Sequence, residues 1–103
     1  MGVTQGSTPV VKCGAEADVI SSVYVPNGIV DVAYLLWVSK TAIAGDDLLV
    51  SDGDGNEIWP DIADGANYTK LFVLKHPVKD LTVTVMDSGA LYVIKAPQVG
   101  WNG

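Results

Sequence analysis

The sequence contains no arginine, and its six lysines are outnumbered by twelve carboxylates, which gives a formal net charge of -6. Proteins that bind nucleic acid obtain much of their affinity from Lys and Arg contacts to phosphate, with Arg preferred for bidentate contacts. This charge balance therefore predicts a protein that does not bind nucleic acid.

Cysteine and histidine each occur once, as Cys13 and His76. A single cysteine excludes an intramolecular disulfide. Two such ligands cannot fill a zinc site, and one histidine next to Pro77 offers no Ser-His-Asp or Cys-His arrangement. We therefore predict no catalytic residue, no cofactor, no metal centre and no enzymatic activity.

Long apolar runs are also missing. The longest, Val32 to Val38, has seven residues, whereas a membrane-spanning helix needs about 20. The first residues lack the charged start and the apolar core of a signal peptide. We therefore expect no membrane association and synthesis in a cytoplasm.

Apolar residues make up 49% of the chain and lie mainly in short runs, rich in β-branched side chains, that turn residues separate. About eight strands are expected, at residues 8–13, 16–25, 29–39, 48–51, 57–59, 69–75, 81–86 and 90–95. Short strands with frequent turns are typical of antiparallel sandwiches and jelly rolls. We predict one all-β domain of this class, an antiparallel β-sandwich or jelly roll, over residues 1–103, with an N-terminal arm at 1–9 and a C-terminal tail at 97–103.

Neighbouring runs are expected to pair as hairpins. The clearest pair is 81–86 with 90–95, because the connecting residues 87–89 end in Gly89, where a three-residue hairpin loop needs a positive φ. A two-residue loop would shift the register by one residue, and both registers stay open. Two further hairpins are expected, 8–13 with 16–25 and 48–51 with 57–59.

The run 29–39 is apolar on both faces of a strand. A helix is the alternative, but the β-branched and aromatic content and the preceding Asn27-Gly28 favour a strand. Apolarity on both faces predicts a central strand that is covered on one side by the opposite sheet and on the other by a loop or a partner subunit. The run 69–75 has a similar middle, and His76-Pro77 is expected to end it.

A weak candidate cation site lies at Asp52, Asp54 and Asn56, which match the first ligands of an EF-hand loop. The match then fails, because Glu57 stands where the loop needs Gly and Ala63 where it needs a bidentate Glu. The same residue types are required by tight hairpin turns, so a turn is the main interpretation.

Several aromatic side chains lie beside turns, where a ring can join the core, anchor a subunit interface or stack on a sugar. A core role is the commonest one for a tryptophan in a small sandwich, and an interface role is the next, because the high apolar content indicates that another subunit covers part of the surface. The candidate interface residues are Val3, Pro9, Trp37, Trp59 and Trp101.

Three stretches together resemble the small β-sandwich decoration or cement proteins of tailed bacteriophage capsids. They are Gly28-Ile-Val-Asp-Val-Ala-Tyr-Leu-Leu-Trp-Val, Ala44-Gly-Asp-Asp-Leu-Leu-Val-Ser-Asp-Gly and Ser88-Gly-Ala-Leu-Tyr-Val-Ile. The third departs from that pattern, because Ala90 separates Gly89 from Leu91.

The resemblance implies a non-enzymatic virion structural protein, made in the host cytoplasm, that binds the outer capsid surface and stabilises it. Its expected partners are further copies of itself, as a trimer, and the major capsid protein. The arm and the tail would contact neighbours, while the acidic segment 46–64 would face solvent. The alternative is a carbohydrate- or receptor-binding module of a phage tail or fibre.

Overall fold

The computed structural model describes residues 3–5, 10–20 and 26–96. Its strands are β1 (Val3–Gln5), β2 (Val10–Cys13), β3 (Ile29–Ser39), β4 (Asp47–Ser51), β5 (Glu57–Ile62), β6 (Tyr68–Lys79), β7 (Thr82–Met86) and β8 (Ala90–Lys95). One 3-10 turn, Pro26–Gly28, precedes β3, and the described ranges contain no α-helix.

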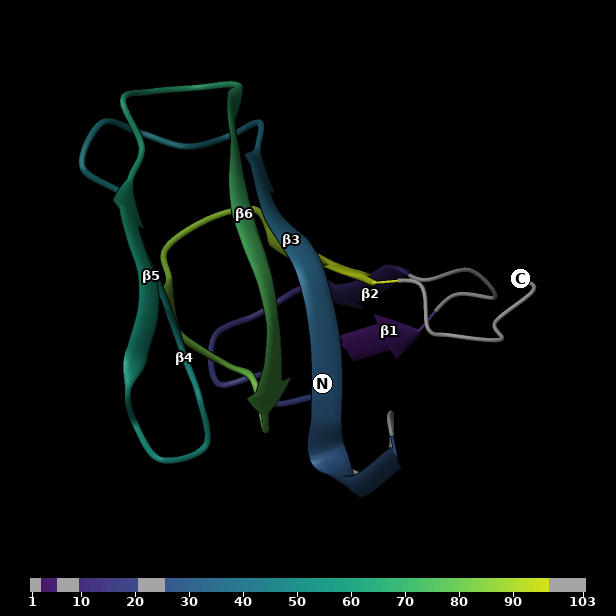
Figure 1. The fold of residues 1–103 in the computed structure, drawn as a ribbon. Coiled ribbons are helices and arrows are strands. Elements are labelled where there is room, and N and C mark those ends of the chain that lie inside the picture. Colours follow the sequence, from purple (N-terminus) through teal and green to yellow (C-terminus); the bar gives the residue numbers. More distant parts are fainter. Residues whose placement is uncertain (1–2, 6–9, 21–25, 97–103) are drawn as a thin grey trace.

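The strands form two antiparallel sheets (Figure 1). The five-stranded sheet has the order β1-β2-β8-β3-β6, and the three-stranded sheet has the order β5-β4-β7. The prediction of an all-β antiparallel sandwich is therefore confirmed.

The strand pairs are nested, which is the topology of a jelly roll. β4 pairs with β5 and β3 with β6, while β2, near the start of the chain, pairs with β8 at its end. Between these, residues 17–20 lie beside β7: the Ala17 amide donates to Val83 O at 2.7 Å, and the Ile20 amide donates to Leu81 O at 2.9 Å. The chain thus folds back on itself as one long double strand rolled into two sheets.

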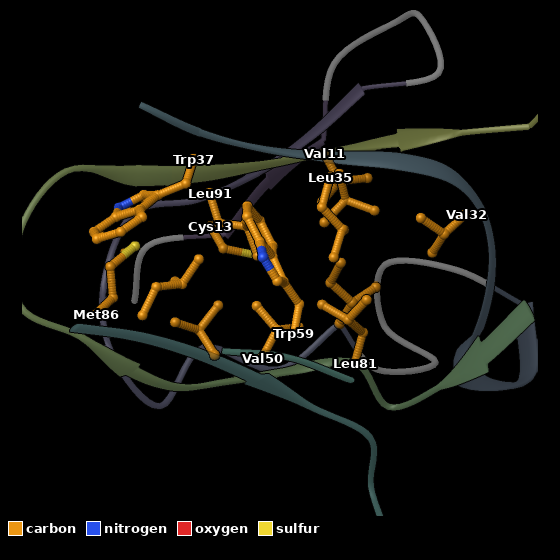
Figure 2. Close-up of a cluster of buried hydrophobic side chains, with 14 of the residues drawn as sticks. Val11, Cys13, Val32, Leu35, Trp37, Val50, Trp59, Leu81, Met86 and Leu91 are labelled. Carbon is orange, nitrogen blue, oxygen red and sulfur yellow. The ribbon is translucent and has the colours of Figure 1, made fainter. Parts of the chain in front are cut away.

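The core lies between the two sheets, as Figure 2 shows for side chains that point inward from both. Fully buried residues include Val11, Val32, Leu35, Trp37 and Leu91 from the five-stranded sheet and Leu48, Val50 and Val83 from the three-stranded sheet. Two ring pairs add to this packing. Trp59 of β5 stacks on Phe72 of β6 at 5.2 Å, and Trp37 meets Tyr68 edge-on at 5.3 Å. The first pair joins the two sheets.

The predicted hairpin of 81–86 with 90–95 is wrong. β7 pairs with β4, whereas β8 lies between β2 and β3 in the other sheet. The connection 87–89 therefore crosses from one sheet to the other, and neither predicted register occurs. Gly89 does have a positive φ of 79°, but a glycine in that conformation serves a crossing connection as well as a hairpin.

The predicted pairing of 8–13 with 16–25 is also wrong. β2 pairs with β1 and β8, and residues 17–20 lie beside β7 in the opposite sheet. Residues 8–9 and 21–25 lie outside the described ranges. The third hairpin is confirmed, since β4 and β5 pair through the turn that follows Ser51.

β3 is a strand, as predicted, but a bulge at Ala33 changes which side chains face the core. Val30 and Val32 point inward before the bulge, and Leu35 and Trp37 do so after it. β6 continues past His76-Pro77 to Lys79, so the expectation that the proline ends it is wrong. Proline is tolerated there because β6 is an edge strand.

We predict that Gly89→Ala destabilises the fold by about 3 kcal/mol, from the left-handed φ and a steric clash together. A Cβ added at Gly89 would contact Val38 O and lie 2.6 Å from Ser39 Cβ. These atoms belong to β3, which cannot easily move away. Urea denaturation measures the loss. The matched control is Gly55→Ala, whose φ is 84° and whose Cβ would meet nothing within 4 Å, so a loss of about 1 kcal/mol is expected. Equal losses would show that the contact with β3 is unimportant.

Candidate functional site

The feature best suited to a function is the solvent-facing side of the five-stranded sheet. Alternate residues of a strand point to opposite sides, so the neighbours of the buried Leu35 and Trp37 face away from the core. The side chains on this side are mostly apolar. We call them the outer apolar face: Val10, Tyr34, Leu36, Val38, Leu71, Val73, Tyr92 and Ile94.

Strand register makes the outer apolar face continuous. Tyr34 of β3 lies opposite Val73 of β6 on one side and Ile94 of β8 on the other. One step along, Leu36 lies between Leu71 and Tyr92 in the same way. Side chains in such cross-strand pairs touch, so the residues form one patch across three strands.

The outer apolar face is accessible to solvent. Leu71 is 52% exposed, Val73 57% and Tyr34 38%. Large apolar side chains that gather on an exposed surface mark contact sites for other proteins or ligands. The sequence signalled this face through the apolarity of both sides of 29–39 and 69–75, but the bulge at Ala33 decided which residues occupy it.

Lys12 is a charged residue at this surface. Its ammonium lies 5.9 Å from the centre of the Tyr92 ring, within the range of a cation–π interaction. None of the residues that define the outer apolar face carries a carboxylate. Covering these eight residues alone desolvates no carboxylate, whereas a wider contact on this side of the sheet would also reach Lys12, Asp31 and Lys79.

Two of the sheet edges, at β6 and β5, are poorly suited to binding another strand. β6, at one edge of the five-stranded sheet, carries Lys70, Lys75, Lys79 and Pro77, with a positive φ of 27° at Lys75. β5, at one edge of the three-stranded sheet, contains Pro60. Lysines, prolines and irregular backbone at sheet edges prevent edge-to-edge pairing. At these two edges a partner strand is thus less readily bound than a partner at a sheet face.

The candidate interface residues from the sequence lie elsewhere. Trp37 and Trp59 are 0% and 6% exposed and belong to the core, so the structure corrects their proposed role as interface anchors. The physical reason is that both point inward and pack against rings of β6. Val3 lies in β1 opposite Cys13 by its backbone. Pro9 and Trp101 lie outside the described residues.

The residues of the weak candidate cation site form a hydrogen-bonded turn. Asp52 Oδ1 accepts the amides of Asp54 and Asn56, each at 2.9 Å, and Oδ2 accepts the side-chain amide of Asn56 at 3.0 Å. These hydrogen bonds, chiefly from the Asn56 side chain, hold the pKa of Asp52 below its ordinary value. Among the described residues no group of three or more His, Cys, Asp or Glu is arranged to hold a metal. The turn accounts for these residues.

Cys13 and His76 are not brought together. Cys13 is buried on β2, and burial followed by the nearby charge of Asp18 raises its pKa to about 12. His76 is exposed on β6, and β8 and β3 lie between the two strands. A thiol with so high a pKa is a poor nucleophile at neutral pH.

Tyr68 is a further aromatic residue beside a turn, and its side chain makes contacts within the domain. Its hydroxyl donates to Asp61 Oδ2 at 3.0 Å, and its ring meets Trp37. Desolvation, followed by the hydrogen bond to Asp61, raises the pKa of Tyr68. With Trp59 buried as well, these two rings do not form a stacking platform for sugars.

Comparison with protein-family models, with curated proteins and with solved structures finds no match to this chain. Within the described residues no helix is long and apolar enough to cross a membrane.

We predict that Cys13 makes stability fall at high pH. Its pKa is raised from 9.0 to about 12 on folding, so the unfolded chain loses the thiol proton first as the pH rises. The contribution is complete below pH 9 and is lost between about 9 and 12, at about 1 kcal/mol per pH unit. Chemical denaturation across this range measures it. Cys13→Ala should show a shallower decline, since only the thiol is removed; parallel declines would refute the role of Cys13.

We predict that Trp59→Ala costs about 3–5 kcal/mol, because it leaves a large cavity beside Phe72. Thermal or urea unfolding checks this value. The control is Ile62→Ala on the same strand, where 59% exposure limits the expected change to about 0.5 kcal/mol. A Trp59→Ala protein as stable as the control would place the indole outside the core.

Proposed function

We propose that the protein is a non-enzymatic structural protein that decorates a viral capsid and acts by adhesion through its outer apolar face. The observation that carries this proposal is the exposure of that face, with Leu71 and Val73 more than half accessible in one copy of the chain. A partner that covers the face removes apolar area from water, which contributes about 25 cal/mol per Å².

The placement of the potentially reactive side chains among the described residues supports adhesion rather than chemistry. Within the described residues the thiol of Cys13 is buried, and the exposed His76 has the carbonyl of Pro77 as its hydrogen-bond partner. The carboxylate of Asp52 is engaged in a turn. A sheet surface of apolar side chains is suited to holding another protein in place.

The assignment to a capsid rests on two further arguments. The stretches 28–38, 44–53 and 88–94 resemble decoration proteins, and the jelly roll is a frequent fold among viral capsid proteins, although a fold alone does not define a function. In this proposal the protein forms a homotrimer on the virion surface and binds the major capsid protein, while the acidic segment 46–64 faces solvent.

We predict that purified protein added to capsids that lack it raises the temperature at which they release their DNA. Val73→Asp should bind those capsids at least about tenfold more weakly, because a charge would then enter an apolar contact. Co-sedimentation and a thermal-release assay provide the two readouts. Ala66→Asp, which places the same charge on an exposed loop residue, is the matched control. Equal binding by both variants, or no binding by the native protein, would contradict the proposal.

A further inference from the structure

We propose that one end of the sandwich, where the loops 40–46 and 63–67 lie side by side, binds a basic and apolar segment of another protein (Figure 1). The residues of this surface, which we call the acidic end, are Ile43, Asp47, Ile62, Asp64 and Asp87. They belong to the three-stranded sheet and its loops, so the acidic end stays accessible when the outer apolar face is covered. The inference goes beyond the proposed function and does not depend on a capsid.

The apolar part of the acidic end is strongly exposed. Ile43 is 70% exposed and Ile62 59%, and no other large apolar side chain among the described residues is as accessible. The segments that carry them are joined by hydrogen bonds, since the Gly45 amide donates to Ala63 O at 3.0 Å and the Ala63 amide to Asp46 O at 2.8 Å. Exposed apolar side chains on adjoining segments form a patch, and such patches mark contact sites.

The loop 40–46 is fixed on several sides in the free protein. Ala42, directly before Ile43, is buried. The Ile43 amide donates to Asp46 Oδ2 at 3.1 Å, and the Asp46 amide donates to Ile43 O at 3.0 Å. The same carboxylate oxygen accepts the Ser88 hydroxyl at 2.7 Å, which ties the loop to the crossing between the sheets. A loop that is already ordered loses little conformational entropy on binding, so Ile43 is suited to anchor a partner.

Carboxylates surround this apolar patch. Asp47 and Asp64 are exposed, and Asp87 lies beside Asp47, whose amide donates to Asp87 Oδ2 at 2.7 Å. Lys40 begins the loop, and the next lysine along the chain is Lys70. An acidic rim repels the phosphates of nucleic acid and of anionic lipid and attracts Lys and Arg. The occupant that complements both properties is a polypeptide segment with cationic and apolar side chains together.

In this contact the apolar side chains of the segment cover Ile43 and Ile62, and its cations approach the carboxylates of the rim. Because the rim charges are exposed, salt screens their attraction and the affinity should fall as ionic strength rises. The apolar contribution is much less sensitive to salt, so both parts can be tested separately.

The test uses labelled synthetic peptides of equal length, one of lysine and leucine, one of glutamate and leucine and one of lysine and serine. Fluorescence anisotropy at low ionic strength measures their binding to the native protein. We expect the lysine and leucine peptide to bind at least about fivefold more tightly than either of the others, because only this peptide matches both the charge and the apolar patch.

A pair of isoleucine variants locates the apolar contact. Ile43→Ser should weaken binding of the lysine and leucine peptide at least about fivefold, because it removes the anchor. Ile29→Ser, at an isoleucine of β3 that is 47% exposed, is the matched control and should bind as the native protein does. Thermal unfolding establishes that the variants are folded, and Ile62→Ser replaces Ile43→Ser if the latter is not.

A pair of charge variants locates the rim. Asp47→Asn combined with Asp64→Asn should weaken binding at least about fivefold at low ionic strength. Asp54→Asn combined with Glu57→Gln removes the same charge from exposed residues at the opposite end of the paired strands β4 and β5. This control should change binding little, because its carboxylates lie away from the acidic end.

Three results would overturn the inference. They are no binding of the lysine and leucine peptide by the native protein, native-like binding by Ile43→Ser, and equal losses in the two charge variants, which would indicate attraction to net charge alone. The proposed function fails separately. Ile43→Ser should bind capsids as the native protein does, and Val73→Asp, which should weaken capsid binding, should leave peptide binding unchanged.

Discussion

The fold depends on how the chain crosses between its two sheets at residues 87–89. There the Ser88 carbonyl accepts a hydrogen bond from the indole N–H of Trp37 at 2.9 Å. The Ser88 hydroxyl lies 2.7 Å from Ser39 Oγ and donates to Asp46 Oδ2 at 2.7 Å. Gly89 follows, pressed against the end of β3. This crossing lets β7 and β8, neighbours in sequence, enter different sheets, and it satisfies the polar groups of Trp37 and the buried Ser39.

The bulge at Ala33 is the second determinant, because it links the fold to the proposed contact. If β3 ran through Ala33 as a regular strand without the bulge, the side chains after it would alternate in the opposite phase, and Leu35 and Trp37 would leave the core. With it, Trp37 reaches the Ser88 carbonyl, and Tyr34 and Leu36 are placed on the solvent side. The same irregularity therefore completes the core and creates the outer apolar face.

The sequence predicted elements better than their partners. Alternation and β-branched content located β3, β4 and β7, because these patterns reflect local geometry. The prediction of strand partners failed where a turn residue fits two structures. A glycine such as Gly89 suits both a hairpin loop and a crossing between sheets. Trp37 and Trp59 were misjudged because burial depends on the bulge and on the facing strand, which no local pattern encodes. The exposed face left a local signal only as apolarity on both sides of two runs.

An exposed apolar sheet is a liability for a free protein, and the charge distribution offsets it. The net charge of -6 comes mainly from the segment 41–67, which lies in and around the sheet that does not carry the outer apolar face. The shared net charge makes free copies repel one another at long range. Net charge thus opposes random aggregation through the exposed apolar side chains.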